Sequence, residues 1–313
     1  MGLLPYVRHA IDGPTPLHLI EAPTPGTGKT KLAKVMARIA TGTEPGTISD
    51  VEGDDEWRKQ ITSALLDSPA VLILDNCKVL DSSSLAEALT TTEWKDRILN
   101  KTKMRSFRVD AVWTATANNP QVSTEMARWC VLIRIVPDVA NPGERDVSDF
   151  KHHPLGQWAD EHWSQLIRAF LTLIERWRNR GRPNGSVSVG SFQEWANIIG
   201  GILEICGFDG FMSNRQRLRD QADREGAMWQ AFVETWSDRW PETPKRVGPL
   251  VELCDDENLL LDVIGSKSRR SKITNLGNAL HDRIDRVIGE YRIVRAGETR
   301  GGGNTYKLEH APR

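Results

Sequence analysis

The sequence predicts an α/β fold with a central parallel sheet, followed by a helical region and a small C-terminal domain. The sheet is indicated by short apolar runs, rich in branched side chains, of the kind buried on both faces of a sheet; they span residues 17–22, 70–75 and 111–117. Beyond them, apolar residues recur at helical spacing, and the chain ends in two strand-like segments around a glycine-rich turn. We therefore expect parts at residues 1–140, 141–246 and 247–313.

Composition sets the broad class. The chain has 313 residues, of which 39% are hydrophobic and 27% charged, as in an ordinary globular protein of two or three domains. Its net charge of −1 means that any surface for nucleic acid must be local. No apolar run approaches the roughly 20 residues that span a bilayer, and the N-terminus does not resemble a signal peptide. We expect a cytoplasmic protein without a membrane partner.

A glycine-rich loop follows the first predicted strand. Residues 23–30 read Pro-Thr-Pro-Gly-Thr-Gly-Lys-Thr, and residues 31–40 continue with apolar side chains at helical spacing. A turn of this kind between a strand and a helix surrounds a phosphate with backbone N–H groups at the positive end of the helix dipole. The loop therefore predicts a nucleotide site formed by Pro25, Gly26, Thr27, Gly28, Lys29 and Thr30.

Two side chains of this loop carry the expected chemistry. Lys29 would reach the β- and γ-phosphates, and the Thr30 hydroxyl would bind Mg²⁺. Pro23 stands where such loops usually have their first glycine, and because proline donates no N–H, the loop must begin differently. We expect ATP and Mg²⁺ as cofactors.

The second apolar run ends in Asp75. Open α/β sheets bind their ligands at the carboxyl ends of the strands, so this carboxylate would lie beside the loop and share Mg²⁺ with Thr30. The alternative is a turn aspartate after a buried strand. The third run ends in Asn118 and Asn119, whose amides can contact the γ-phosphate or the attacking water. We choose Asn118, with Asn119 as the alternative.

The loop, the strand ending in Asp75 and the Thr-Ala-Asn-Asn-Pro segment at residues 116–120 resemble those of AAA+ ATPases. The resemblance is closest to the superfamily-3 and MCM-like helicases of phages, plasmids and mobile islands. It implies a P-loop AAA+ core in which Asn118 is sensor 1. It also implies an arginine finger that acts on a neighbouring subunit's nucleotide, and hence a homo-oligomeric ring, expected to be a hexamer. Arg128 fits the finger best and Arg134 next; a structural salt bridge is the alternative.

The segment between the second and third runs, residues 89–109, predicts a hairpin, whose tip would be residues 100–103. In the families that the chain resembles, such a hairpin carries a basic residue into the central pore, where it grips a single DNA strand. Lys101 and Lys103 match that role, and Arg105 would support it through phosphate contacts. A solvated basic loop is the alternative.

The catalytic base is the weakest match, because Asn76 follows Asp75 where AAA+ proteins usually have glutamate. An asparagine can orient water but cannot accept its proton. Glu56 and Glu52 are candidates from the segment after the presumed second strand. The interpretation that we favour is that this acidic cluster starts a helix. The chain would then hydrolyse ATP slowly or use it as a switch.

The middle region predicts helices at residues 158–180, 192–205 and 215–240, the last weakened near Gly226. The resemblance implies a helical lid here. A lid often carries a sensor arginine, for which Arg215, Arg217 and Arg219 are available; a solvated face is the favoured interpretation.

The last 67 residues predict a helix at 271–288, then paired strands at 291–295 and 305–308. This pattern resembles a winged helix. Ten basic and four acidic residues lie between Lys267 and Lys307, which favours a surface for duplex DNA; its candidate residues are Arg269, Arg270, Lys272, Arg283 and Arg300. A winged helix that binds protein is the alternative.

Taken as a whole, the sequence predicts an ATP-dependent DNA helicase or replication-initiation motor of a phage or mobile element. The alternative is an ATP-gated DNA-binding initiator or transposition regulator with little unwinding activity.

Overall fold

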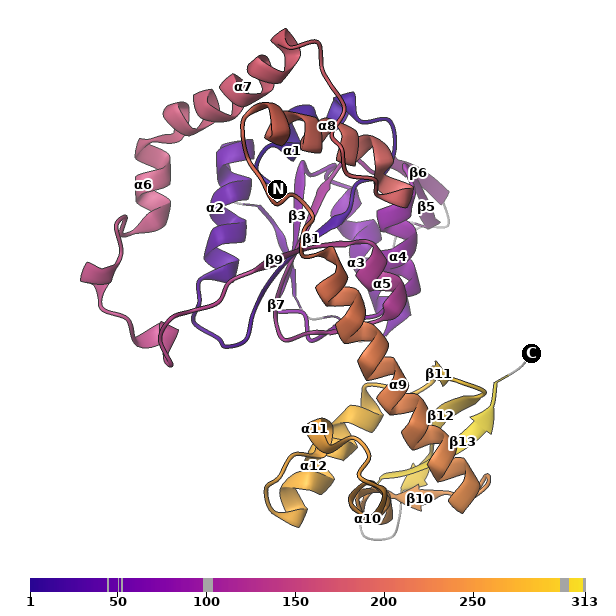
Figure 1. The fold of residues 1–313 in the computed structure, drawn as a ribbon. Coiled ribbons are helices and arrows are strands. Elements are labelled where there is room, and N and C mark those ends of the chain that lie inside the picture. The colour runs from indigo at the N-terminus through magenta and orange to yellow at the C-terminus, as the bar shows by residue number, and fades with distance from the viewer. Residues whose placement is uncertain (44, 50, 52, 98–103, 299–303, 312–313) are drawn as a thin grey trace. The chain divides into compact units, whose positions relative to one another are not determined.

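The computed structural model describes residues 1–313 except 44, 50, 52, 98–103, 299–303 and 312–313. The chain divides into two compact units, Met1–Arg219 and Asp220–Arg313 (Figure 1). The boundaries expected after residues 140 and 246 do not coincide with this division. The reason is packing. Helices that follow the sheet share its core, whereas the second half of the long helix Arg215–Arg239 shares the core of the C-terminal unit.

The first unit is built on a five-stranded parallel sheet, which confirms the predicted α/β class. Its strands, in spatial order, are β2 (Thr47–Ser49), β3 (Val71–Asp75), β7 (Val112–Asn118), β1 (Leu17–Ala22) and β9 (Cys130–Arg134). The three middle strands are buried along their length except at the last residues of β3 and β7. Branched, apolar sequences form these strands because neither face meets water.

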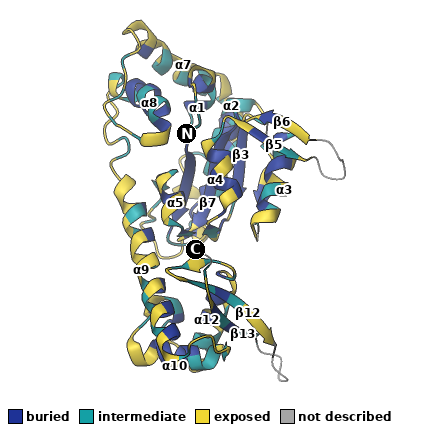
Figure 2. Cartoon of the chain, turned by 90° about the vertical axis from the view of Figure 1, so that its right-hand side faces the viewer, coloured by how far each residue is buried: buried dark blue, intermediate teal, exposed yellow. Residues whose placement is uncertain are grey.

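Helices cover both faces of the sheet (Figure 1). The helices α2 (Lys29–Thr41) and α8 (Gln193–Ile205) contribute to one apolar core with the strands. This core includes Ala33, Ala37, Ile73, Trp195 and Ile20, and the short α1 (Leu4–Val7) and the following 3₁₀ turn η1 (Arg8–Ala10) adjoin it. The opposite face carries α3 (Asp54–Leu65), α4 (Ser83–Thr90) and α5 (Thr124–Arg128). Figure 2 shows the buried strands between these exposed helical surfaces.

The helical region differs in detail from its prediction. The helix expected at 158–180 is two helices, α6 (Leu155–Glu161) and α7 (Trp163–Asn179), separated at His162. The third predicted helix, α9 (Arg215–Arg239), continues through Gly226, which costs about 1 kcal/mol relative to alanine but does not end a helix. Short 3₁₀ turns complete the region: η2 (Pro142–Glu144), η3 (Val147–Asp149) and η4 (Gly190–Phe192).

The hairpin predicted within residues 89–109 is present. Strands β5 (Glu93–Arg97) and β6 (Met104–Arg108) pair antiparallel, with Trp94 opposite Phe107, and both side chains are buried. Its tip, which includes Lys101 and Lys103, lies outside the described residues.

The second unit combines helices with a small antiparallel sheet of strand order β10-β13-β12-β11. Its elements after α9 are β10 (Lys245–Arg246), α10 (Val247–Glu257), α11 (Leu261–Ile264), α12 (Arg269–His281), β11 (Val287–Ile288), β12 (Tyr291–Glu298) and β13 (Asn304–His310). Trp229, Phe232 and Trp236 of α9 pack into its core. The predicted pairing of 291–295 with 305–308 is confirmed. The helix predicted to reach 288 ends at His281, and Asp285 adopts a left-handed φ of 65° and bonds to Ile293 O instead.

Within the part of the chain that the structure describes, no helix has both the length and the apolar character needed to cross a membrane.

Candidate functional site

The carboxyl ends of the three middle strands meet at one edge of the first unit's sheet. The register sets Ala22, the last residue of β1, opposite Asn118 at the end of β7. Strand β7 also pairs with β3, which ends in Asp75. The glycine-rich loop follows β1 directly, so the strand order brings together the loop and both polar residues predicted from the sequence.

The loop adopts backbone conformations that favour glycine. Gly26 and Gly28 have φ values of 76° and 89°, in the left-handed region. A Cβ atom on Gly26 would also lie 2.7 Å from the backbone nitrogen of Gly143, so residues 142–143 approach the loop closely. Helix α2 begins at Lys29, directly after this turn, and its N-terminus is therefore available to an anion.

Lys29 is buried at the centre of the site, with 7% of its surface exposed. Its Nζ donates to Asn118 Oδ1 at 2.7 Å, to Thr27 Oγ1 at 3.0 Å and to the backbone oxygen of Thr24 at 3.3 Å. Burial lowers the pKa of Lys29. Its acceptors among the described residues are all neutral, so the ammonium group is oriented without being neutralised. Such an ammonium suits a phosphate ligand.

A carboxylate and two hydroxyls form the second half of the site. Thr30 Oγ1 and Thr116 Oγ1 each donate to Asp75 Oδ1 at 2.7 Å. Thr116 Oγ1 also accepts from the backbone nitrogen of Asn76 at 2.9 Å. The Asp75 carboxylate is therefore held in place from two sides, directly beside the first residues of α2.

Sequence reasoning missed Thr116. A signal was available, because residues two apart on a strand face the same side, and Thr116 stands two before Asn118.

This donor set fits Mg²⁺. The ion is usually held by one or two carboxylates together with waters and substrate phosphates, rather than by a complete protein cage. Thr30 and Asp75 would supply the protein's oxygen ligands. A further observation fits a ligand at the loop: the hydroxyl of Thr24 is buried and makes no hydrogen bond within the described residues. A buried polar atom of this kind is costly unless a ligand or water satisfies it.

The structure separates the two candidate amides. Asn118 bonds to Lys29 and approaches Asn76, with Asn118 Nδ2 lying 3.5 Å from Asn76 Oδ1. Asn119 instead donates to the backbone oxygen of Pro23 at 3.3 Å and so holds the start of the loop. Pro23, which departs from the usual loop pattern, is therefore held by Asn119. Asn118 is the amide that faces the site.

A short pair of parallel strands joins the segments that follow β3 and β7. Strand β4 (Val79–Leu80) pairs with β8 (Gln121–Val122), and the backbone nitrogen of Cys77 donates to Thr116 O at 2.8 Å. Asn76 stands between the end of β3 and this pair, with a left-handed φ of 59° that asparagine tolerates. Tertiary contacts therefore fix the position of Asn76.

Glu56 is tied to its own helix. It accepts from Gln60 at 3.0 Å and from Lys59 at 3.3 Å, and these bonds lower the pKa of Glu56. No described hydrogen bond joins it to Asp75 or Lys29. This geometry favours the helix-start interpretation over a role as catalytic base. Glu52, the other candidate, lies outside the described residues.

The two candidate finger residues differ in their surroundings. Arg134 pairs with Glu21, whose surface is only 1% exposed, which makes this a structural ion pair. Arg128 ends α5 just before β9, whose first residue, Cys130, pairs with Leu17 at the start of β1. The loop begins after the far end of β1, roughly 17 Å away at about 3.3 Å per residue. Arg128 therefore lies at the edge opposite to its own chain's site.

The candidate DNA-binding residues fall into several groups. Arg105 is exposed on β6, with its guanidinium 5.3 Å from the ring centroid of Phe107. Arg270 is exposed on α12. On the same helix, Arg269 pairs with Glu252, and Lys272 pairs with Asp255 at 2.6 Å. Arg300 lies outside the described residues.

Arg283 does not fit the expected role. It is 4% exposed, pairs with Glu225 and stacks over Trp229 at 4.0 Å from the ring centroid. Burial lowers the pKa of Arg283 to about 10. The expectation that Arg283 faces DNA is therefore wrong in this structure, because the core of the C-terminal unit takes up its side chain.

Comparison with protein-family models and with curated proteins finds no match for this chain.

Proposed function

We propose that the chain is an ATPase of the AAA+ type that binds ATP and Mg²⁺ at the edge formed by β1, β3 and β7. The observation that carries this proposal is the pair of contacts Lys29–Asn118 and Thr30–Asp75. They join the loop to both neighbouring strand ends, although the partners stand far apart in the sequence. Few arrangements other than a triphosphate site need this combination of a glycine-rich turn, an unneutralised lysine and a hydroxyl–carboxylate pair.

Each residue has a role in this site. The loop amides and the N-terminus of α2 bind the phosphates, and Lys29 contacts the β- and γ-phosphates. Bound Mg²⁺ neutralises charge on the phosphate oxygens. Thr30 and Asp75 hold it, Thr116 orients the Asp75 carboxylate, and Asn118 presents its amide to the γ-phosphate or to the attacking water.

We further propose that ATP drives DNA unwinding or remodelling, as in a helicase or replication-initiation motor of a phage or mobile element. The chain would act as a homo-oligomeric ring, a hexamer, around a single DNA strand. Three features support this: the β5–β6 hairpin with exposed Arg105, the distance of Arg128 from its own nucleotide site, and a C-terminal unit whose helices and β12–β13 hairpin resemble those of a winged helix. Arg270 is its exposed candidate for duplex contact.

The test is ATP hydrolysis with and without single-stranded DNA, followed by strand displacement on a forked duplex. We expect DNA to stimulate hydrolysis and the fork to be unwound. Hydrolysis that ignores DNA, together with an intact fork at every oligomeric state, would rule out the motor while leaving the ATP site standing.

A second candidate is an ATP-gated DNA-binding regulator, such as an initiator or transposition regulator. Asn76 favours it, because no carboxylate among the described residues bonds to Asn76 or to Asn118 at the place of the missing base. Tight ATP binding with turnover far below the roughly 1 s⁻¹ of slow enzymes would favour this candidate.

A further inference from the structure

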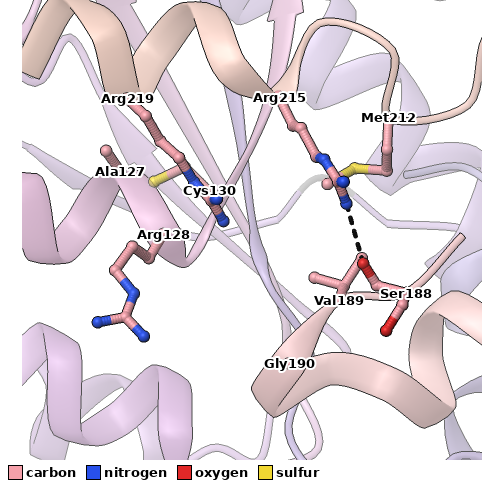
Figure 3. A pocket seen from close by; sticks show the side chains of 9 residues that line it. All are labelled: Ala127, Arg128, Cys130, Ser188, Val189, Gly190, Met212, Arg215 and Arg219. Carbon is pink, nitrogen blue, oxygen red and sulfur yellow. Dashed lines mark hydrogen bonds between the residues drawn. The ribbon is translucent and has the colours of Figure 1, made fainter.

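A basic pocket of about 240 Å³ lies beside the end of α5, within the first unit (Figure 3). Arg128, Arg215 and Arg219 line it. None of its lining residues carries a carboxylate. The thiol of Cys130, at the pocket wall, is neutral, because burial raises its pKa to about 12. The pocket therefore holds positive charge without a built-in counterion.

The three arginines come from two elements and line the same pocket. Arg215 and Arg219 stand four residues apart on α9 and so share one face of this helix, whereas Arg128 ends α5, and its side chain extends away from the other two (Figure 3). Arg215 donates to the backbone oxygen of Ser188 at 2.9 Å, a neutral partner that orients the guanidinium without cancelling its charge. Arg217 lies between them in sequence but does not line the pocket. It is close enough to Arg134 to influence its pKa, which is lowered mainly by burial and further by the charge of Arg217.

The charges of the pocket differ in exposure: Arg128 and Arg215 are exposed to solvent, and Arg219 is half-buried. Like charges four residues apart weaken a helix. The Nε atom of Arg219 is buried and has no hydrogen-bond partner within the described residues, a loss that is largest for charged groups. Arg128 and Arg219 form no ion pair within the described residues either. An anion with several oxygens would satisfy these donors and offset the repulsion together.

We propose that this pocket binds a phosphate group. Guanidinium groups match phosphate oxygens with paired, parallel hydrogen bonds, and arginines that line one pocket without a carboxylate suit this ion. A pocket of about 240 Å³ has room for a tetrahedral oxyanion with part of its hydration shell. The pocket lies at the edge of the sheet opposite to the glycine-rich loop, so it is a second phosphate site, separate from that of the chain's own nucleotide.

The test measures pyrophosphate binding by titration calorimetry at low ionic strength. All chains carry Lys29→Ala, so that the loop does not dominate the signal, and thermal unfolding checks that each is folded. We expect one remaining site, weakened about ten-fold or more by Arg219→Gln and by Arg128→Gln. Arg217→Gln, a charge change two residues away on the same helix, is the matched control and should leave the affinity unchanged. Equal weakening by Arg217→Gln would overturn the pocket in favour of general positive charge.

A second measurement identifies the source of the phosphate; this arm alone rests on the proposed function. Analytical ultracentrifugation compares self-association with and without a non-hydrolysable ATP analogue, in chains with native Lys29. If the pocket receives the nucleotide held by a second copy, Arg219→Gln should abolish the ATP-dependent association and Arg217→Gln should not. If the ligand is a free phosphate compound, neither variant should change the ATP-dependent self-association, while Arg219→Gln should still weaken pyrophosphate binding. Indifference to Arg219→Gln in both measurements would overturn the proposal, whether or not the chain hydrolyses ATP.

Discussion

Lys29 in the first unit and Arg283 in the C-terminal unit are both buried cations, with 7% and 4% of their surfaces exposed. Their surroundings differ. Within the described part of the chain, Lys29 bonds only to neutral oxygens, from Asn118, Thr27 and Thr24. Arg283 pairs with the Glu225 carboxylate and stacks over Trp229. A buried cation that already has its carboxylate is part of the core, whereas one held only by neutral groups is available for an anionic ligand.

The same contrast extends to the surface. Arg269 and Lys272 were expected to face DNA, yet each pairs with a carboxylate of α10. Among the described residues, the three arginines of the pocket at α5 have no such partner. The number of basic residues in a segment therefore says less about binding than the presence or absence of nearby carboxylates.

The largest effect is expected from Lys29→Ala. Removing the ammonium group should lower ATP affinity by about 100-fold or more, because charged hydrogen bonds to phosphate oxygens are lost. Stability should hardly change, since the charge that is removed is desolvated and has no carboxylate partner among the residues that the structure describes. ATP binding and chemical denaturation check the two parts. Lys95→Ala, at an exposed lysine of β5, is the control and should retain ATP binding. Loss of stability with ATP binding intact would break the comparison.

Arg283→Ala should show the opposite pattern. It leaves Glu225 without its partner and opens space beside Trp229, so we expect a loss of about 2–3 kcal/mol in unfolding free energy. The expected loss is below that of a fully buried pair because the side chain of Glu225 is 23% exposed. Urea denaturation measures it. Arg270→Ala, at an exposed arginine, should stay within about 0.5 kcal/mol. A stable Arg283→Ala chain that loses duplex DNA would restore the DNA-facing role.

Thr116→Val tests the support of the carboxylate. It removes one of two hydroxyl donors to Asp75 and the acceptor for the backbone nitrogen of Asn76. We expect the affinity for Mg²⁺, measured through ATP hydrolysis, to fall about ten-fold, in the range found for groups that orient metal ligands. Magnesium titrations of the hydrolysis rate are the measurement. Thr114→Val, two residues earlier on β7 at a hydroxyl without a described partner, is the matched control and should keep the magnesium affinity unchanged.

The smallest effect is expected at Asp54. Its carboxylate accepts hydrogen bonds from neutral serine groups, just as the Lys29 ammonium donates to neutral oxygens. Partial burial would raise the pKa of Asp54, but hydrogen bonds from Ser82, Ser83 and Ser84 outweigh it and lower the pKa to about 2. Because the folded pKa lies below the unfolded one, the carboxylate stabilises the fold above about pH 4 and loses this effect as pH falls towards 2.

Asp54→Ala should therefore cost about 1 kcal/mol at pH 7, a value discounted for solvent exposure, and almost nothing near pH 2. Denaturation across this pH range measures the difference. Asp55→Ala, at its exposed neighbour, is the control for the loss of an acidic residue from the first turn of α3. A difference between wild type and Asp54→Ala that stays constant with pH would contradict the assignment to ionised Asp54.

The local sequence pattern was sufficient to predict elements whose structure depends on neighbouring residues in the chain. The runs at 17–22, 70–75 and 111–117 correspond to β1, β3 and β7, because branched apolar residues in short runs form buried strands. The β5–β6 and β12–β13 hairpins were likewise predictable. The end of α12 was not, because it depends on a distant contact: the backbone nitrogen of Asp285 donates to the backbone oxygen of Ile293 on β12.

By itself, the sequence determined the sheet class, the loop and the residues at the strand ends, since each depends on neighbours along the chain. Only the tertiary structure decided which amide faces Lys29, that Thr116 supports Asp75, that Arg283 is buried and that Arg128 meets Arg215 and Arg219 in one pocket. These outcomes depend on strand order, on register and on which charges fall within reach of one another. Such contacts join residues that are distant in the chain, and no local pattern specifies them.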